Sequence, residues 1–189
     1  GMAKNLFNFK SEENRLFLYV IVGTLPLVFI GFFIFDYIVE MFDNLLLLGA
    51  SFLANGILLM ISEIKIGKKQ LNFFNSFIIG LAQLVSAIPG ISRSGATMST
   101  GFLLGIDKIK VFQYSFLLAI PAILGAVILS AKELTFEVDF VTLILSGVVS
   151  FIVSYLSLNV LRKIVIKTKF HYFGIYTILL GLLVIFLNL

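Results

Sequence analysis

The feature that most limits how this 189-residue chain can fold is a series of long apolar runs. Five of them approach the length of about 20 residues that an α-helix needs to cross a hydrocarbon core of roughly 30 Å. They are Leu16–Phe35, Leu45–Ile61, Val111–Ser130, Phe140–Leu161 and Tyr172–Leu187. Hydrophobic residues make up 60% of the chain, against about 45–50% in soluble domains. The sequence therefore predicts an all-α, polytopic membrane protein.

Composition also excludes several kinds of site and partner. The sequence has no cysteine, which rules out disulfides, thiolate nucleophiles and cysteine-bound metals. The net charge is +4, but no basic stretch is interleaved with exposed aromatic residues, so we expect no nucleic-acid partner. Residues 1–15 are too rich in charge for a cleavable signal peptide. The opening Gly-Met is compatible with a remnant of expression or with the edge of a longer chain.

Two apolar stretches in the middle of the chain, Ser76–Ile88 and Thr97–Ile106, are too short to cross the bilayer separately. The segment Ser86–Thr100, which joins them, is rich in proline, glycine and hydroxyl groups. This pattern fits a re-entrant hairpin, whose irregular backbone must be covered by protein or water. It also fits one broken helix that crosses the membrane.

The distribution of charge separates these two readings. With a re-entrant hairpin, all of the 14 basic residues except Arg93 and Lys132 fall on one side of the membrane. A crossing helix would instead place the cluster Arg162–Lys169 opposite the amino-terminal lysines. The positive-inside rule therefore favours five transmembrane helices and one re-entrant hairpin, residues 76–106, which enters from the cytoplasmic side. In this interpretation residues 1–189 form a single membrane domain.

Arg93 is the one charged residue of the predicted hairpin. An arginine at the bilayer centre costs roughly 2.5–3.5 kcal/mol on insertion scales, so it requires a polar partner. Pro89 interrupts the helix, and Gly90 and Gly95 permit unusual backbone angles or close contacts. Ser94 or a neighbour can cap the following helix, whose amino end attracts anions. Since a guanidinium group matches two phosphate oxygens, the segment predicts a phosphate site.

A second reading of the same residues needs no ligand. Arg93 would then pair with a carboxylate or with backbone carbonyls, and the glycines would serve helix packing. Gly101 and Gly105 fit such a packing face. Gly147 and the serines at 150, 154 and 157 of the same run fit another.

Other candidate functional groups are less clearly placed. Asn55 and Gln83 are polar side chains within apolar runs, and each either lines a cavity or bonds a neighbouring helix. Ser92 and Ser94 have no evident activating base. The acidic residues lie at the ends of the apolar runs, so no metal-ligand set is visible within the bilayer, and His171, the only histidine, is expected at the interface.

The segment Pro89–Thr97 reads Pro-Gly-Ile-Ser-Arg-Ser-Gly-Ala-Thr and closely resembles a motif of the undecaprenyl-diphosphate phosphatases, also known as bacitracin-resistance proteins. The segment Tyr114–Pro121 resembles the stretch that follows this motif in the family. The resemblance implies a multi-pass plasma-membrane hydrolase that converts a long-chain prenyl diphosphate to the monophosphate and so recycles the carrier lipid of cell-wall synthesis. It also implies two inverted halves, each with a re-entrant hairpin.

The resemblance assigns roles within the motif. Arg93 would clamp the diphosphate, with Ser92, Ser94 and Thr97 as the adjacent polar wall. The candidate catalytic residues are thus Arg93, Ser92 and Ser94, and the candidate substrate-binding residues are Gly90, Gly95, Thr97 and Gln83. The expected partners are the prenyl diphosphate lipid and the membrane. The family also implies a divalent cation, Mg²⁺ or Ca²⁺, whose ligands do not lie in this chain.

The sequence departs from the family in one large respect. The family's first half carries a glutamate-rich stretch and a Pro-x-Ser-Ser-x-Gly-His motif, whose serine and histidine are the usual nucleophile and base, and this sequence lacks that motif. We interpret the chain as the carboxy-terminal two-thirds of a longer protein, or as a natural half that needs a partner chain, and we expect it to be inactive alone. The sequence leaves open whether the chain forms a homo-oligomer. Two other hypotheses are a lipid-carrier transporter or flippase gated by the hairpin, and a non-catalytic membrane scaffold.

Overall fold

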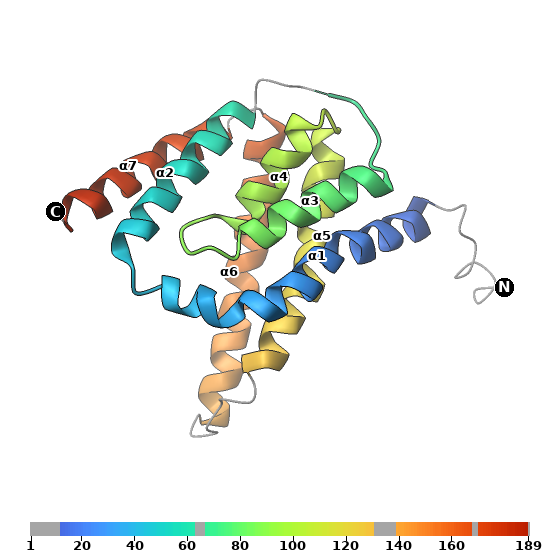
Figure 1. The fold of residues 1–189 in the computed structure, drawn as a ribbon. Coiled ribbons are helices and arrows are strands. Elements are labelled where there is room, and N and C mark those ends of the chain that lie inside the picture. Colours follow the sequence, from blue (N-terminus) through green and yellow to red (C-terminus); the bar gives the residue numbers. More distant parts are fainter. Residues whose placement is uncertain (1–11, 63–66, 131–138, 168–169, 189) are drawn as a thin grey trace.

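The computed structural model describes residues 12–62, 67–130, 139–167 and 170–188 (Figure 1). Within these residues the regular elements are seven α-helices and one isolated bridge between Lys69 and Ile106. The helices are α1 (Glu12–Met41), α2 (Leu45–Ser62), α3 (Phe73–Val85), α4 (Arg93–Leu103), α5 (Lys108–Ser130), α6 (Phe140–Ile166) and α7 (His171–Phe186). The predicted all-α class is confirmed.

Three of the helices are long and apolar enough to cross a membrane. They are α2, α5 and α6, whose crossing segments have mean hydropathies of 2.1, 2.0 and 2.1. Two further predicted spans coincide with α1 and α7, but their apolar parts, Arg15–Gly31 and His171–Phe186, are shorter. The structure is that of a polytopic membrane protein, in which the predicted spans differ in length.

Polar side chains fix where several helices begin, because each accepts a hydrogen bond from a backbone N–H that the helix leaves unpaired. Asn72 Oδ1 accepts from the N–H of Asn75 at 2.8 Å at the start of α3. Asp107 Oδ1 accepts from the N–H of Ile109 at 3.0 Å at the start of α5. Asp139 caps α6 in the same way. The polar residues between apolar runs thus set the helix boundaries.

Glycines bring two pairs of helices into close contact. Helices α2 and α7 run antiparallel, and a Cβ atom on Gly56 would lie 2.7 Å from the carbonyl oxygen of Gly174. Helices α1 and α3 meet in the same way, because a Cβ on Gly80 would collide with the carbonyl oxygen of Gly23. Small residues at such crossings are the usual means of packing helices in membranes, where lipid removes the hydrophobic drive for association.

Tyr114 of α5 joins three helices in the centre of the fold. Its side chain is fully buried, and its hydroxyl donates to the carbonyl oxygen of Tyr19 in α1 at 2.8 Å. The carbonyl oxygen of Ser76 in α3 lies 3.3 Å from the same hydroxyl. A buried tyrosine hydroxyl needs such a partner, so Tyr114 fixes α1 and α3 relative to α5.

The expected packing faces had different outcomes. Gly101 packs as predicted, since a Cβ there would lie 2.7 Å from the side chain of Val111. The prediction for Gly105 was wrong: this residue has φ +78° and forms the turn after α4, a conformation that favours glycine. A Cβ on Gly147 would meet no other helix within 4 Å among the described residues, so none of these residues packs on the face predicted on α6 at this position.

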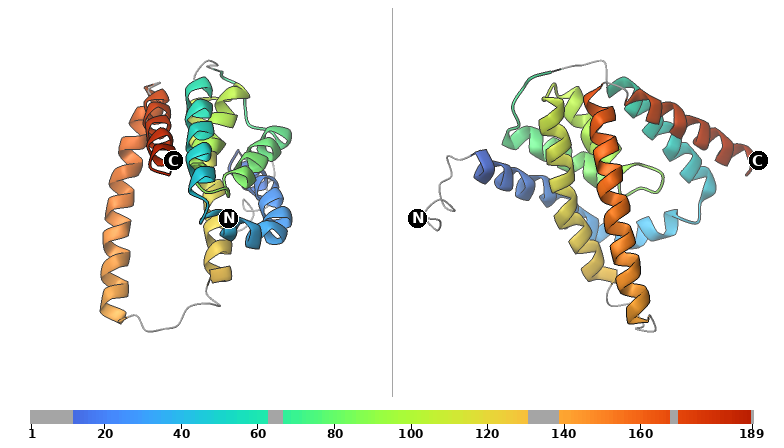
Figure 2. Two further views of the ribbon diagram at one scale, coloured as in Figure 1. Left: turned by 60° about the vertical axis from the view of Figure 1, so that its left-hand side comes forward. Right: turned by 180° about the vertical axis from the view of Figure 1, so that it is seen from behind.

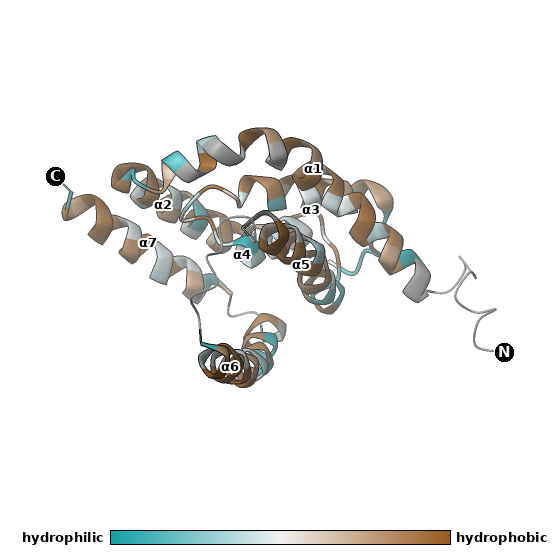
Figure 3. Cartoon of the chain, turned by 90° about the horizontal axis from the view of Figure 1, so that it is seen from below, coloured by the Kyte–Doolittle hydropathy of each residue, from teal (hydrophilic) through white to brown (hydrophobic). Residues whose placement is uncertain are grey.

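Helix α6 stands beside the other helices and contacts them mainly near its carboxy-terminal end (Figure 2). Its residues from Phe140 to Val160 are exposed, and its surface is mostly apolar (Figure 3). An exposed apolar surface of this length is what a lipid-facing helix presents.

Candidate phosphate-binding site

The predicted hairpin consists of α3, a turn over residues 86–92, and α4. Its two ends meet, because the N–H of Lys69 donates to the carbonyl oxygen of Gly105 at 3.0 Å and the N–H of Asp107 donates to the carbonyl oxygen of Lys69 at 3.2 Å. The chain thus enters and leaves this region at one place (Figure 1). That geometry is the one that a re-entrant segment requires, since both ends must lie on the same side.

Gly90 lets the turn double back. Its φ is +90°, which a residue with a side chain rarely adopts. A Cβ atom at this position would also lie 2.9 Å from the carbonyl oxygen of Leu48 and 3.0 Å from Cβ of Ser51, both in α2. The prediction that Gly90 is needed for its backbone angle or for close contact is confirmed on both counts.

Ser92 is the residue that caps α4. Its Oγ accepts a hydrogen bond from the N–H of Gly95 at 3.1 Å. A Cβ on Gly95 would lie 2.9 Å from Cβ of Ser92, so glycine allows the cap to close over the first turn. The sequence predicts this role for Ser94 or a neighbour, and the neighbour Ser92 performs it.

Asn55 of α2 supports the turn from outside the motif. Its Oδ1 accepts a hydrogen bond from the backbone N–H of Ser92 at 3.2 Å. Asn55 is 1% exposed, so the acceptor of this part-buried bond lies in the interior. The sequence alone does not decide whether Asn55 lines a cavity or bonds a neighbouring helix. A polar amide in the middle of a span is costly in a membrane unless it is hydrogen-bonded, and this cost is the feature that points to such a contact.

Arg93 is the first residue of α4 and is half-buried. Its Nη1 atom is buried and has no hydrogen-bond partner among the described residues. An unpaired guanidinium donor in a protein interior is unfavourable, because it has lost water without gaining another acceptor. The reading in which carboxylates or backbone carbonyls of the protein bond all of the Arg93 donors therefore does not account for Nη1.

Thr97 is fully buried and connects α4 to α5. Its Oγ1 lies 2.9 Å from the carbonyl oxygen of Arg93, to which it can donate a hydrogen bond. It also lies 2.6 Å from Ser115 Oγ, and either hydroxyl can donate in that pair. Ser115, a residue that the sequence alone does not single out, is 3% exposed. The pair holds the first turn of α4, which begins at Arg93, against α5.

Further buried polar atoms around the hairpin have no partner among the described residues. They are both amide atoms of Gln83, Nδ2 of Asn55 and Oγ of Ser99. Gln83 is 2% exposed and lies in the last two turns of α3. Since most buried polar groups in proteins are hydrogen-bonded, this set identifies the hairpin and the adjoining part of α2 as the place where polar partners are missing.

The described residues contain no group of three or more acidic or histidine side chains placed to hold a metal ion. His171 begins α7, where its ring lies tilted by 37° against that of Tyr172 with a centroid distance of 4.4 Å. Divalent cations such as Mg²⁺ and Ca²⁺ require several oxygen ligands, carboxylates above all. The donor set seen in the described ranges therefore does not fit such a cation.

Comparison with known proteins gives one family. Residues 1–183 match the family described as "Bacitracin resistance protein BacA". A protein of Thermosipho africanus named "Undecaprenyl-diphosphatase" is 36% identical over 99% of this chain and 75% of its own length. Proteins of the same name from Desulforapulum autotrophicum and Bacteroides thetaiotaomicron are 41% and 34% identical, over 69% and 74% of their lengths. This chain belongs to the bacitracin resistance protein BacA family.

Proposed function

We propose that this chain acts in the hydrolysis of undecaprenyl diphosphate to undecaprenyl phosphate, in the plasma membrane. Family membership and the name shared by the relatives support the reaction. The observation in this molecule that carries the proposal is the buried Nη1 of Arg93, which lacks a partner among the described residues at the amino end of a capped helix. A phosphate oxygen would satisfy that donor, and the helix end would favour its negative charge.

The reaction breaks the P–O bond between the two phosphoryl groups and adds the elements of water. Free phosphate leaves, and the lipid keeps one phosphate. Phosphoryl transfer needs positive groups that are already oriented toward the phosphoryl oxygens, because negative charge there must be stabilised in the transition state. Arg93 supplies this group, with Ser92 and Ser94 beside it.

The other residues of the motif hold Arg93 in position or open space for the diphosphate. Gly90 and Gly95 allow the backbone to turn and close tightly. Thr97 bonds the carbonyl of Arg93 and so acts as a positioning residue. Gln83 offers an amide with two unpaired polar atoms and is the further substrate-binding candidate.

We further propose that this chain contributes the phosphate-binding part of the active site and not the nucleophile. The 189 residues contain neither a Ser-Ser-x-Gly-His motif nor a histidine near Arg93 in sequence. The nucleophile, the base and the ligands of a divalent cation such as Mg²⁺ or Ca²⁺ would come from residues outside this sequence, in the same polypeptide or in a partner chain. The hairpin would enter the membrane from the cytoplasmic side.

The direct test measures binding and turnover separately with this chain in detergent micelles. A non-hydrolysable prenyl bisphosphonate should raise the midpoint of thermal unfolding of the wild type. Arg93→Ala should weaken its affinity by at least about tenfold, because a charge-assisted bond is lost. Arg162→Ala, which removes an exposed arginine of α6, is the matched control and should bind as the wild type does.

Phosphate release from prenyl diphosphate should be absent or nearly so with the chain alone. Robust turnover that depends on Arg93 would disprove the division of the active site. Equal bisphosphonate affinity in wild type and Arg93→Ala would remove Arg93 from the phosphate site. Movement of prenyl phosphate across vesicle membranes without phosphate release would favour the transporter instead.

A further inference from the structure

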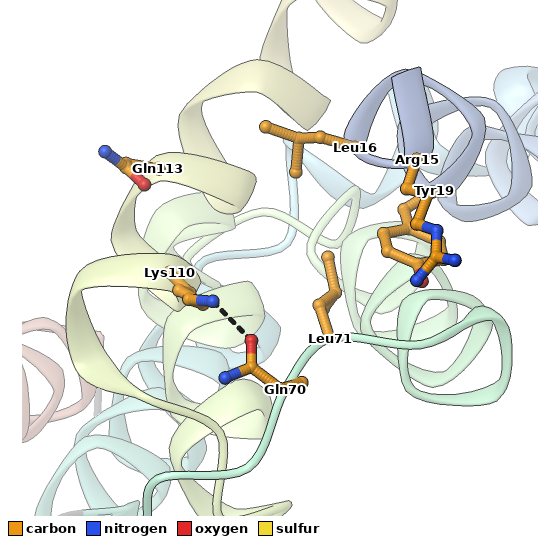
Figure 4. A pocket seen from close by; sticks show the side chains of 7 residues that line it. All are labelled: Arg15, Leu16, Tyr19, Gln70, Leu71, Lys110 and Gln113. Atoms are coloured by element: carbon orange, nitrogen blue, oxygen red, sulfur yellow. Dashed lines mark hydrogen bonds between the residues drawn. The ribbon is translucent and has the colours of Figure 1, made fainter. Parts of the chain in front are cut away.

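A cavity with two cationic side chains in its lining lies beside the two joined ends of the hairpin, away from the Arg93 turn. It has a volume of about 330 Å³, within the usual range for small-ligand pockets. Figure 4 shows that its lining comes from α1, from the segment before α3 and from α5. The lining residues are Arg15, Leu16, Tyr19, Gln70, Leu71, Lys110 and Gln113.

The cavity is distinct from the Arg93 turn. Gln70 and Leu71 precede α3, whereas Arg93 follows the turn at its other end. Helix α3 has 13 residues, so these two places are separated by roughly 20 Å along its axis. At this separation the two sites would bind different phosphate groups.

The charges of the cavity have one sign. Arg15 and Lys110 come from different helices, and none of the seven lining residues is acidic. Lys110 Nζ donates to Gln70 Oε1, which fixes both side chains at the wall (Figure 4). Arg15 is exposed and offers a planar set of donors that fits two oxygens of one phosphate. The cavity is therefore suited to an anion with several oxygen atoms.

Its location relates the cavity to the membrane surface. Gln70 directly follows Lys69, whose backbone bonds join the two ends of the hairpin. The charge distribution predicts that this end faces the cytoplasm. Leu16 and Leu71 add an apolar wall beside the cations. Basic pockets of this kind between helices at the cytoplasmic interface suit phosphate-bearing headgroups.

We propose that this cavity binds a phosphate group at the membrane interface, as carried by an anionic glycerophospholipid or by free phosphate. The proposal goes beyond the hydrolysis proposed for Arg93 and does not depend on it. Near a membrane surface each cation contributes a roughly fivefold gain in affinity for anionic lipid, so removal of both should weaken binding roughly 25-fold.

The experiment compares lipid and free phosphate as ligands of the full 189-residue chain. The chain in neutral detergent is titrated with phosphatidylglycerol, with phosphatidylcholine and with inorganic phosphate, and binding is read from the thermal midpoint and from native mass spectrometry. The test variant is Arg15→Gln with Lys110→Gln. The control is Lys68→Gln with Arg162→Gln, which removes two exposed cations that do not line the cavity. All measurements are repeated in an Arg93→Ala background, so that phosphate at the Arg93 turn does not contribute.

We expect phosphatidylglycerol to bind the wild type and the control variant more tightly than phosphatidylcholine does, and the test variant to lose this preference. If inorganic phosphate binds but phosphatidylglycerol shows no preference, and the test variant loses the phosphate binding, the cavity is a site for free phosphate. Equal binding by the test and control variants would overturn the proposal, as would the absence of any preference for either phosphate probe in the wild type. Arg15→Lys with Lys110→Arg keeps both charges and should retain the preference, which separates loss of binding from loss of fold.

Discussion

Asn55 Oδ1 accepts a hydrogen bond from the backbone N–H of Ser92 at 3.2 Å, across 37 positions of sequence. This bond joins the middle of α2 to the residue that caps α4. The geometry of the turn before Arg93 thus depends on a residue of another helix.

Asn55→Leu should therefore disturb the phosphate site. The change removes the acceptor of a part-buried hydrogen bond, at a cost of about 0.5–1.5 kcal/mol, and loosens the turn. We expect weaker binding of a prenyl bisphosphonate by up to roughly tenfold, measured by titration in detergent. Asn159→Leu, on the exposed surface of α6, is the control and should leave affinity unchanged. An unaltered affinity in Asn55→Leu would show that the turn holds its shape without this bond.

The pair Thr97 and Ser115 should be coupled energetically. Their hydroxyl oxygens lie 2.6 Å apart in the interior between α4 and α5. Thr97→Val and Ser115→Ala should each lower the free energy of unfolding by about 0.5–1.5 kcal/mol. The double variant should lose less than the sum of the two, by about 0.6 kcal/mol, a typical value for polar pairs between membrane helices. A double-mutant cycle of denaturant unfolding in micelles measures this difference, and strict additivity would contradict the coupling.

A larger side chain at the crossing of α2 and α7 should destabilise the fold. A side chain at Gly56 would meet the backbone of Gly174, so Gly56→Ile should separate the helices and lower the free energy of unfolding by roughly 1–3 kcal/mol or more. The matched change Gly147→Ile places its Cβ on a face of α6 where no other described helix lies within 4 Å. It should have little effect on the thermal midpoint of the isolated chain. Similar midpoints for the two variants would mean that the crossing tolerates expansion.

Tyr114→Phe should loosen the contact of α1 and α3 with α5. The substitution keeps the ring and removes only the hydroxyl that donates to the carbonyl oxygen of Tyr19. The expected loss is about 1 kcal/mol in the free energy of unfolding, from one buried hydrogen bond. Tyr176→Phe on α7, where the tyrosine is exposed, is the control and should stay within about 0.5 kcal/mol of the wild type. Thermal unfolding followed by circular dichroism compares the two.

Part of this molecule follows from its sequence because the physical signals are local. The length of the apolar runs is enough to predict helices in a membrane, since a bilayer imposes both apolarity and internal hydrogen bonding. The role of Gly90 could also be predicted locally, because a left-handed backbone conformation is a property of a single residue and favours glycine. The identity of the motif around Arg93 likewise lies in nine adjacent residues.

Other properties depend on which distant residues meet, and only the tertiary structure decides them. Asn55 is one polar residue in an apolar run until α2 packs against the hairpin and brings it to Ser92. The spacing of Gly105 suggested helix packing, but the bond from Lys69 to its carbonyl oxygen places it at the turn where the hairpin ends. The cavity lined by Arg15 and Lys110 exists only because α1 and α5 meet there. Apolar length determines that the helices form, whereas side-chain volume and hydrogen bonds between helices determine which polar groups face one another.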